Sequence, residues 1–418
     1  MDILVVGGGG REHAICLKLR QSSRVNKLYC APGNGGIAQV AECVDVAATD
    51  IEKIVRFAKE NPVDFVVVAP DDPLALGMVD ALESAGIRAF GPRKDAAIIE
   101  SSKVFSKNLM KKYNIPTARY EIFTDAVAAK EYIREKGAPI VVKADGLALG
   151  KGVVVAMENK TALDAVDSMM LDKKFGESGS SIVIEEHMTG PEVTVLVFTD
   201  GKTIVPMLSS QDHKRAHTGD LGPNTGGMGA FCPSRNYSAD IADTCMKTIF
   251  RPTIDAMNEE GRRFKGVLYF GLMLTPEGPR VIEYNARFGD PEAQPILTML
   301  KTDLLEIFEA VVEERLHELN IEWRDGYACC VVMASGGYPL TYEKGFEITG
   351  LNDVPDDITI FHAGTARTDS AFVTNGGRVL GVTATGDTLE NASARAYKGV
   401  TCINFKKAYY RTDIGCKK

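Results

Sequence analysis

The stretch IVVKADGLALGKGVVVA, residues 140–156, places two runs of β-branched residues on either side of a glycine-rich loop. Such runs favour strands, and the loop between them predicts a β-hairpin with a pliable tip. The Gly-Lys pair in the loop is followed by Gly152 and not by Ser or Thr, so this is no Walker A motif. A cation at Lys143 and backbone N–H groups at the tip suit a flap that closes over phosphates. A solvated surface hairpin is the alternative.

The chain before this hairpin alternates short strands with helix-length segments from residue 1 to about 102. Strands are expected at 3–6, 27–30, 64–69 and 88–90. This alternation predicts a doubly wound, parallel α/β domain over residues 1–102.

The chain after residue 102 has a mixed α and β pattern. Helices are expected from 103 until just before Ile115-Pro116, at 125–136, 240–260, 304–319 and 391–398, and strands at 120–123, 181–185, 194–198, 266–274 and 280–284. A second domain is placed at 103–325. Residues 326–418 alternate short strands with glycine-rich turns and predict a small β-rich domain.

The composition is that of a globular protein: 418 residues, 45% hydrophobic and 25% charged, with a net charge of 48 − 56 = −8. No apolar run approaches the roughly 20 residues of a membrane helix. The acidic balance disfavours nucleic acid as a partner. Nine cysteines without a C-x-x-C pair indicate neither a zinc site nor a disulfide framework. The first strand begins without a signal peptide, so we expect a cytoplasmic protein.

Three further stretches carry candidate chemistry. The first is the turn Gly7-Gly8-Gly9-Gly10-Arg11-Glu12, where backbone N–H groups at a helix start can meet a phosphate. Its glycine spacing breaks the dinucleotide fingerprint, which favours a phosphorylated small molecule over NAD. A tight packing turn is the alternative.

The second stretch is the strand 281–287, whose period of two puts Glu283, Asn285 and Arg287 on one face. Carboxylate and amide oxygens suit Mg²⁺ between protein and nucleotide, and the arginine can neutralise charge during phosphoryl transfer. A solvent-facing strand with a Glu283–Arg287 ion pair is the alternative.

The third stretch is the long polar loop at 209–230, which contains Lys214-Arg215 and a Thr225-Gly226-Gly227 turn. Loops of this length within a domain are usually functional or disordered. We expect it to hold a second anionic substrate, and a disordered surface lid is the alternative.

Six motifs together resemble the ATP-grasp carboxylate–amine ligases, and among them the phosphoribosylamine–glycine ligase family. They are GGREHA at 9–14, APGN at 31–34, KADGLA at 143–148, QDHKR at 211–215, GPNTGGMGA at 222–230 and RFGDPE at 287–292. The resemblance spans nearly the whole chain. It implies an N-terminal substrate domain, an ATP-grasp domain with a lid subdomain at about 118–190, and a C-terminal domain.

The resemblance also implies an ATP site with a divalent cation, Mg²⁺ or Mn²⁺. Glu283 and Asn285 match the metal ligands. The hinge at 183–188 matches the adenine contact, made partly through backbone groups, and Glu192 matches the ribose contact. The implied ATP-binding residues are Lys103, Lys143, Gly146, Gly150, Lys151, Gly152, Glu185, Glu186, Met188 and Glu192.

The implied reaction joins glycine to 5-phosphoribosylamine in purine biosynthesis, and ATP becomes ADP and phosphate by way of a glycyl phosphate. Lys143, Arg287 and Asp212 are the implied catalytic residues. The implied substrate-binding residues are Gly8, Gly9, Gly10, Arg11, Glu12, Asn34, Asp212, Lys214, Asn224, Thr225, Gly226 and Arg287. The expected partners are these small molecules alone, with no nucleic acid or membrane, and the expected state is a monomer or small homo-oligomer.

Three other functions stay open at this point. A biotin carboxylase-like ATP-grasp enzyme is opposed by the loop at 224–230, and a nicotinamide-dependent dehydrogenase by the broken glycine fingerprint. A nucleotide-sensing protein without turnover is opposed by the presence of Lys143, Glu283, Asn285 and Arg287.

Overall fold

The computed structural model of the chain describes residues 1–147, 152–172 and 179–416, and the first hundred of them form an α/β unit. Its five strands pair in parallel in the order β3-β2-β1-β4-β5. The elements are β1 (Asp2–Gly7), α1 (Gly10–Leu19), β2 (Lys27–Pro32), η1 (Ile37–Gln39), β3 (Glu42–Cys43), α2 (Ile51–Glu60), β4 (Phe65–Val68), α3 (Asp71–Leu76), α4 (Met78–Ser84), β5 (Arg88–Phe90) and α5 (Lys94–Ser101).

Both faces of this sheet are covered, as the predicted doubly wound arrangement requires. On β1, Leu4 and Val6 pack into one core with residues of α2 and α4, whereas Ile3 and Val5 pack into another with residues of α1. All four side chains are fully buried. Strands buried on both faces read as continuous apolar runs, which is why residues 3–6 show no polar alternation.

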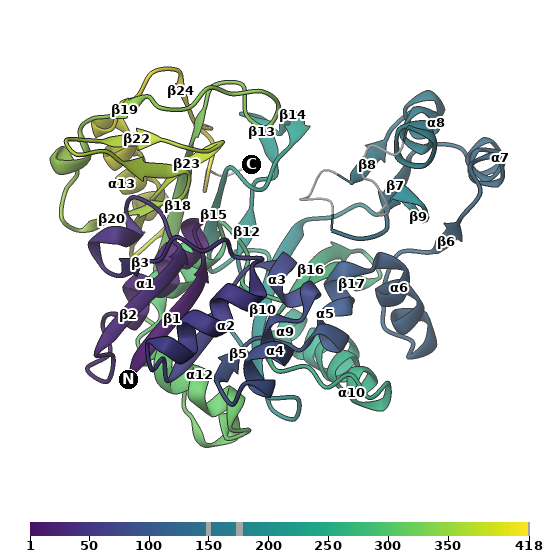
Figure 1. The fold of residues 1–418 in the computed structure, drawn as a ribbon. Coiled ribbons are helices and arrows are strands. Elements are labelled where there is room, and N and C mark those ends of the chain that lie inside the picture. Colours follow the sequence, from purple (N-terminus) through teal and green to yellow (C-terminus); the bar gives the residue numbers. More distant parts are fainter. Residues whose placement is uncertain (148–151, 173–178, 417–418) are drawn as a thin grey trace.

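A second, antiparallel sheet of four strands in the order β6-β9-β7-β8 stands apart from the rest of the chain, with α7 and α8 beside it (Figure 1). We call this unit the lid. Its elements are β6 (Tyr120–Phe123), α7 (Ala126–Lys136), β7 (Ile140–Ala144), β8 (Val153–Ala156), α8 (Asn159–Val166), η2 (Asp167–Leu171) and β9 (Ile182–Glu186). The predicted hairpin is therefore present as β7 and β8, and its tip at 148–151 lies outside the described residues.

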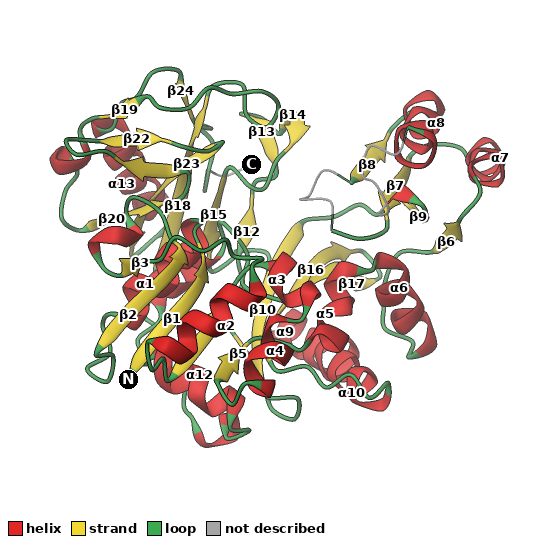
Figure 2. Cartoon of the chain, viewed as in Figure 1, coloured by secondary structure: helices red, strands yellow, loops and turns green. Residues whose placement is uncertain are grey.

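The central sheet has the order β11-β10-β16-β17, and helices lie around it (Figure 2). Its strands are β10 (Glu192–Thr199), β11 (Ile204–Pro206), β16 (Gly266–Thr275) and β17 (Gly278–Asn285). Its helical segments, with the one that leads into the lid, are α6 (Lys103–Lys112), α9 (Ala239–Cys245), η4 (Met246–Phe250), α10 (Arg251–Glu259), α11 (Ala293–Met299), α12 (Leu304–Val312) and η5 (Leu316–Glu318).

Two predicted helices are interrupted in the structure. The one at 240–260 is divided by η4, a π-helical turn, just before Pro252 at the start of α10, where proline has no N–H to donate. The one at 304–319 ends at Val312 because Glu314 takes a positive φ of 59°. Within the described ranges, no helix is long and apolar enough to cross a membrane.

The C-terminal part forms a sheet in the order β12-β15-β18-β23-β20, with β24 also paired to β18, and a smaller sheet in the order β19-β22-β21. Its elements are β18 (Tyr327–Ser335), β19 (Glu347–Ile348), η6 (Leu351–Asp353), β20 (Ile358–His362), β21 (Thr365–Arg367), β22 (Phe372–Thr374), β23 (Arg378–Gly386), α13 (Leu389–Cys402) and β24 (Ala408–Tyr409). β12 (Gln211–Asp212) and β15 (Gly229–Cys232) join it from the preceding region, so this sheet extends across the boundary that we placed near residue 325.

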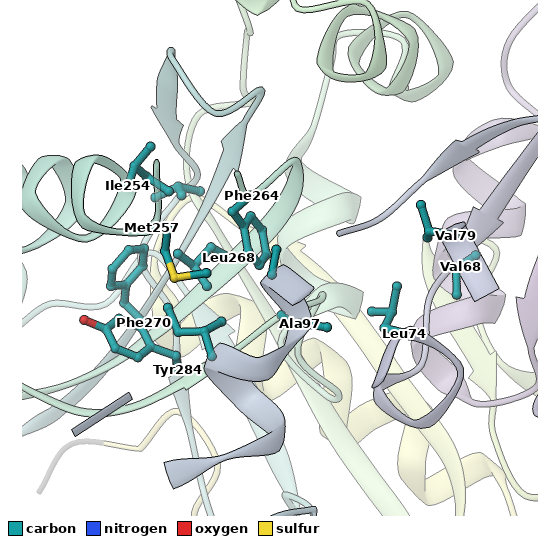
Figure 3. Close-up of a cluster of buried hydrophobic side chains, with 14 of the residues drawn as sticks. Val68, Leu74, Val79, Ala97, Ile254, Met257, Phe264, Leu268, Phe270 and Tyr284 are labelled. Atoms are coloured by element: carbon teal, nitrogen blue, oxygen red, sulfur yellow. The ribbon is translucent and has the colours of Figure 1, made fainter. Parts of the chain in front are cut away.

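The N-terminal and central units share their hydrophobic cores. One cluster runs from the N-terminal sheet and helices to the central sheet and α10, and Figure 3 shows part of it: Val68, Leu74, Val79, Ala97, Ile254, Met257, Phe264, Leu268, Phe270 and Tyr284. The second cluster brings Phe90 of β5 against Phe308 of α12, with ring centroids 3.9 Å apart. These units cannot separate without exposing apolar surface to water.

Replacing Phe308 by Ala tests this shared core. We expect the free energy of unfolding to fall by about 3–5 kcal/mol, because the fully buried ring contacts both Phe90 and Phe288. Urea denaturation followed by circular dichroism measures the loss. The control is Leu340→Ala at a side chain that is 78% exposed; equal effects of the two changes would contradict the interpretation.

Candidate active site

A cavity of about 1200 Å³ opens between the lid, the central sheet and the C-terminal sheet. Of the predicted site residues, those that line it are Arg11, Lys103, Lys143, Gly146, Gly152, Glu185, Glu186, Met188, Glu192, Asp212, Lys214, Asn224, Thr225, Gly226, Glu283, Asn285 and Arg287. Gly8, Gly9, Gly10, Glu12 and Asn34 are not in its wall. Gly150 and Lys151 lie outside the described residues.

Two lysines share one buried carboxylate at the back of the cavity. The Nζ of Lys143 lies 2.9 Å from Oε2 of Glu185, and the Nζ of Lys107 lies 3.0 Å from Oε1. Burial lowers the pKa of Lys107 to about 8 against the opposing charge of Glu185. Sequence reasoning missed Lys107, although it follows Lys103 by four residues and so lies on the same face of α6.

A bulge in the central sheet gives Lys143 a second partner. Gly271 and Leu272 of β16 pair with Glu283 and Val281, so Ile282 has no partner across the ladder. The Nζ of Lys143 donates to the carbonyl of Ile282 over 3.1 Å. The bulge therefore holds this lysine at the edge of the strand that carries Glu283.

The start of α6 is tied to the base of the flap. Ser102 caps the helix by accepting from the N–H of Phe105, and Asp145 accepts from the N–H of Val104. Lys103 donates through Nζ to the carbonyl of Gly146 at 2.8 Å. Burial lowers the pKa of Lys103, while the charge of Glu283 opposes that shift.

The two carboxylates of the predicted adenine hinge are already engaged within the protein. Glu185 pairs with the two lysines, and Glu186 pairs with Arg119 and Arg280. Neither carboxylate is left free for a base, so the backbone of this segment and the side chains of His187 and Met188, which line the cavity, remain to meet one.

Lys214 links two carboxylates on neighbouring walls. Its Nζ lies 3.3 Å from Oε2 of Glu192 and 3.4 Å from Oε1 of Glu283. Burial alone would raise the pKa of Glu283, but Lys214, Lys143 and Lys103 hold it at about 2. This carboxylate is therefore ionised at any working pH, as a metal ligand must be.

Arg287 is held by the N-terminal unit. Its Nη2 lies 2.7 Å from Oε1 of Glu100 and 3.7 Å from Oδ2 of Asp71, and the N–H of Ala286 donates to the other oxygen of Glu100 over 2.6 Å. Burial raises the pKa of Glu100 to about 7, although Arg287 opposes the shift. The buried Nε of Arg287 has no hydrogen-bond partner among the described residues, and the side chain lines the cavity.

Asp212 lies on β12 among other acidic side chains. Burial raises its pKa to about 8, Lys214 opposes the shift, and the charge of Glu292 adds to it. The pKa of Glu292 is also raised by burial. The sequence identified Asp212 as a site residue through the motif QDHKR at 211–215. Glu292 was missed, although it belongs to the motif RFGDPE at 287–292.

The first glycine turn serves packing more than cavity lining. A Cβ at Gly8 would lie 2.4 Å from the carbonyl oxygen of Gly33, so only glycine fits this close approach. The carboxylate of Glu12 accepts from the N–H of Gly9 at 2.6 Å and pairs with Arg11 at 2.6 Å. Of this turn, Arg11 is the residue that reaches the cavity.

Asn34 also has its hydrogen bonds filled by the protein. Its amide donates to the carbonyls of Gly8 and His362, both at 2.9 Å, and its carbonyl accepts from the N–H groups of Gly36 and Ile37. The side chain thus joins the first turn to the C-terminal sheet.

Two C-terminal residues that sequence reasoning missed complete the wall. Arg378 donates through Nη1 to the carbonyls of Gly226 and Asp290, at 2.7 and 2.6 Å, and the N–H of Gly226 donates to the hydroxyl of Tyr338 at 3.0 Å. No motif in the sequence marked either residue, because their partners are about 90 to 150 positions away in the chain.

Comparison with family models matches three successive parts of the chain. The phosphoribosylglycinamide synthetase N domain matches residues 1–100, the ATP-grasp (A) domain of the same enzyme matches 101–293, and its C domain matches 328–417.

Curated relatives agree over their full length. The phosphoribosylamine–glycine ligase of Caldanaerobacter subterraneus subsp. tengcongensis is 48% identical over 414 residues, which are 99% of both chains. That of Rhodopirellula baltica is 50% identical over 425 residues, covering 100% of this chain and 97% of the relative.

Solved structures show the same family and a wider fold group. The phosphoribosylamine–glycine ligase of Thermotoga maritima is 33% identical, with a TM-score of 0.85 over 99% of this chain and 100% of that one. The biotin carboxylase domain of Hydrogenobacter thermophilus 2-oxoglutarate carboxylase has a TM-score of 0.76 at 15% identity, over 98% of this chain and 91% of that one, and shares the fold alone. With full-length relatives near half identity and matching models for all three domains, this chain belongs to the phosphoribosylamine–glycine ligase family of ATP-grasp enzymes.

Proposed function

We propose that this protein joins glycine to 5-phosphoribosylamine to form glycinamide ribonucleotide, with ATP converted to ADP and phosphate. The observation that carries the proposal is one cavity in which the lysines of the lid and α6 face Glu283, Asn285 and the loop at 211–226. Cations for a polyphosphate, oxygen ligands for its metal and a second polar wall thus meet in one place. Family membership supplies the identity of the two substrates.

The reaction proceeds in two balanced steps. A carboxylate is a poor electrophile, so a glycine carboxylate oxygen first attacks the γ-phosphorus of ATP, the bond to the β-phosphate oxygen breaks, and ADP leaves. The amine of phosphoribosylamine then attacks the acyl carbon, phosphate leaves, and the new amide nitrogen loses a proton. No side-chain nucleophile is needed, and the protein acts by positioning and charge neutralisation.

The proposed ATP site runs from the hinge to the flap. Lys143 and Lys103 contact the phosphates, with the flap closing over them, while the backbone of 185–188 meets adenine and Glu192 the ribose. Lys143 is buried and Lys103 half-buried, and both are held by fixed partners before the nucleotide arrives, so little reorganisation is needed on binding.

Glu283 and Asn285 are the proposed metal ligands, and the donor set fits Mg²⁺ or Mn²⁺. Among the described residues no three His, Cys, Asp or Glu side chains gather closely enough to form a metal cage. Two protein oxygens with phosphate and water oxygens are the usual coordination of such a cation beside a nucleotide. When bound, the cation neutralises charge on the transferring phosphoryl group.

The proposed acceptor site lies on the other side of the phosphates. Arg287, with its unpartnered Nε, faces the transferring phosphoryl group, and Asp212 receives the ammonium group of glycine. The phosphoribosyl group lies between Arg11, the turn at 8–12 and the segment at 214–226. Gly8, Gly9, Gly10, Glu12 and Asn34 act there by shaping and holding the wall that Arg11 reaches.

The activity assay follows phosphate release from ATP and Mg²⁺ with both substrates, each omitted in turn. Phosphoribosylamine is formed in the assay from ribose 5-phosphate and ammonia. We expect release to require glycine and the amine together, and release that needs neither would contradict the proposal.

Arg287→Ala should lower turnover about 10²–10³-fold, because it removes a preorganised charge at the transferring group. Arg315→Ala, at an exposed ion pair, is the control.

Lys107→Met tests how Lys143 is held. Without Lys107, the buried Glu185 pairs with Lys143 alone and draws it away from the phosphates, so we expect the KM for ATP to rise about tenfold. Lys111→Met, one turn further along the same helix at an exposed position, is the matched control and should stay within about twofold. Equal KM values in the two variants would refute this role.

Asp212 gives a pH prediction. Its pKa near 8 means that it is largely protonated at neutral pH in the free protein, and only the ionised form pairs with an ammonium group. The kcat/KM for glycine should therefore rise as the pH increases from about 6.5 to about 8.5. Asp212→Asn should lower this quantity and flatten its pH profile; a profile in the variant that matches the wild type would rule the role out.

A further inference from the structure

The hairpin formed by β13 (Arg215–His217) and β14 (Leu221–Asn224) extends from the cavity wall, and we call residues 214–225 the arm. In Figure 1 it lies between the C-terminal sheet and the lid. Its base is closed by Thr225, whose N–H and hydroxyl both donate to the carbonyl of Lys214, at 2.7 and 2.9 Å. Lys214 itself reaches Glu283 in the cavity.

A fully buried arginine from the C-terminal segment holds this arm. Arg411 is 0% exposed. Its Nη1 donates to the carbonyl of Arg215 at 3.0 Å, and its Nη2 lies 2.8 Å from Oδ1 of Asp220. Asp413 receives its Nε and Nη2, both at 2.7 Å. One guanidinium thus joins the start of β13, and the turn just before β14, to the C-terminal segment.

Further hydrogen bonds join the arm to the C-terminal segment. The N–H of Gly219 donates to Asp413 at 2.9 Å, and the N–H of Thr412 donates to the hydroxyl of Thr218 at 3.1 Å. The hydroxyl of Tyr409 donates to the carbonyl of Ala216. The arm therefore contacts the C-terminal segment at nearly every residue from 215 to 220.

The arrangement is better suited to setting a geometry than to adding stability. Burying a guanidinium carries a desolvation penalty, which its ion pairs and hydrogen bonds only offset, and apolar packing would serve stability as well. The contacts are made to a backbone carbonyl next to Lys214 and to the turn of the arm, where direction is fixed. Asp220 and Asp413 also line the cavity, so the contact between the arm and the C-terminal segment borders the site.

We propose that Arg411 is a positioning residue that fixes the arm, and with it Lys214, against the cavity, so that binding of the phosphorylated amine depends on the C-terminal segment. This rests on the proposed function, which places the amine beside the arm. The lysines proposed to contact the ATP phosphates lie on the lid side. Lys214 also pairs with Glu192 and Glu283, which the proposed function assigns to ATP and its metal, so ATP binding should depend on Arg411 less than binding of the amine does, but not be independent of it.

The test uses the full chain with Arg411→Lys, which keeps the charge but loses the forked set of donors. Arg395→Lys is the control, because Arg395 also joins a backbone carbonyl, of Thr385, to a carboxylate, of Asp357, and neither partner belongs to the arm. We expect the KM for phosphoribosylamine to rise about tenfold or more, and the KM for ATP to rise several-fold less than that. Hydrogen exchange at Gly219 and its neighbours should become faster.

Two results would overturn the proposal. Faster exchange in the arm with an unchanged KM for the amine would show that the arm does not position the site. Equal increases in the KM values for ATP, glycine and the amine would show a general structural role. Should Arg411→Lys fail to fold, Tyr409→Phe carries the same test, because it removes only the hydroxyl that contacts Ala216 and His217 of the arm.

The wild-type assay separates this inference from the proposed function. If the wild type shows no turnover that needs phosphoribosylamine, the proposed function fails. In that case unchanged hydrogen exchange in Arg411→Lys would show that Arg411 does not fix the arm. Faster exchange would support that Arg411 fixes the arm, although its effect on binding of the amine would no longer apply.

Discussion

Three cations that line the cavity are each held in place by a carboxylate carried on another element. Glu185 of β9 holds Lys143, Glu283 of the central sheet holds Lys214, and Glu100 of α5 holds Arg287. Without these partners, the three positive charges around one cavity would repel one another. A site that must accept a polyanion therefore depends on anions that are already there, and on the elements that carry them.

The shared hydrophobic core makes this charge arrangement possible. Glu100 belongs to the N-terminal unit and Arg287 to the central one, and the distance of 2.7 Å between their atoms is kept by apolar clusters that include residues of both. The lid has a separate core of its own. It is joined to the rest instead by polar contacts, among them that of Lys143 with the carbonyl of Ile282 and that of Glu185 with Lys107.

The sequence predicted most of what depends on local pattern. The parallel N-terminal sheet, the β7–β8 hairpin and the strand that carries Glu283 all follow from periodicity and are confirmed. The expected extent of that strand, 281–287, was wrong at its end, because β17 ends at Asn285 and Arg287 lies beyond it. What it could not predict are partners that meet only after folding: Glu100 for Arg287, and Arg378 for Gly226. Helix interruptions at Pro252 and Glu314 were missed for another reason, since apolar periodicity continues across a π-turn or a short break.

The likeness to a biotin carboxylase domain at 15% identity is a likeness of fold alone. What is particular to this chain is how the segment at 211–226 is held from the C-terminal side. β12 and β15 pair into the C-terminal sheet, and Arg378 fixes the turn at Gly226 from the same side. This wall of the cavity is therefore held in place by residues from the end of the chain, although many of the residues that line it come from the middle.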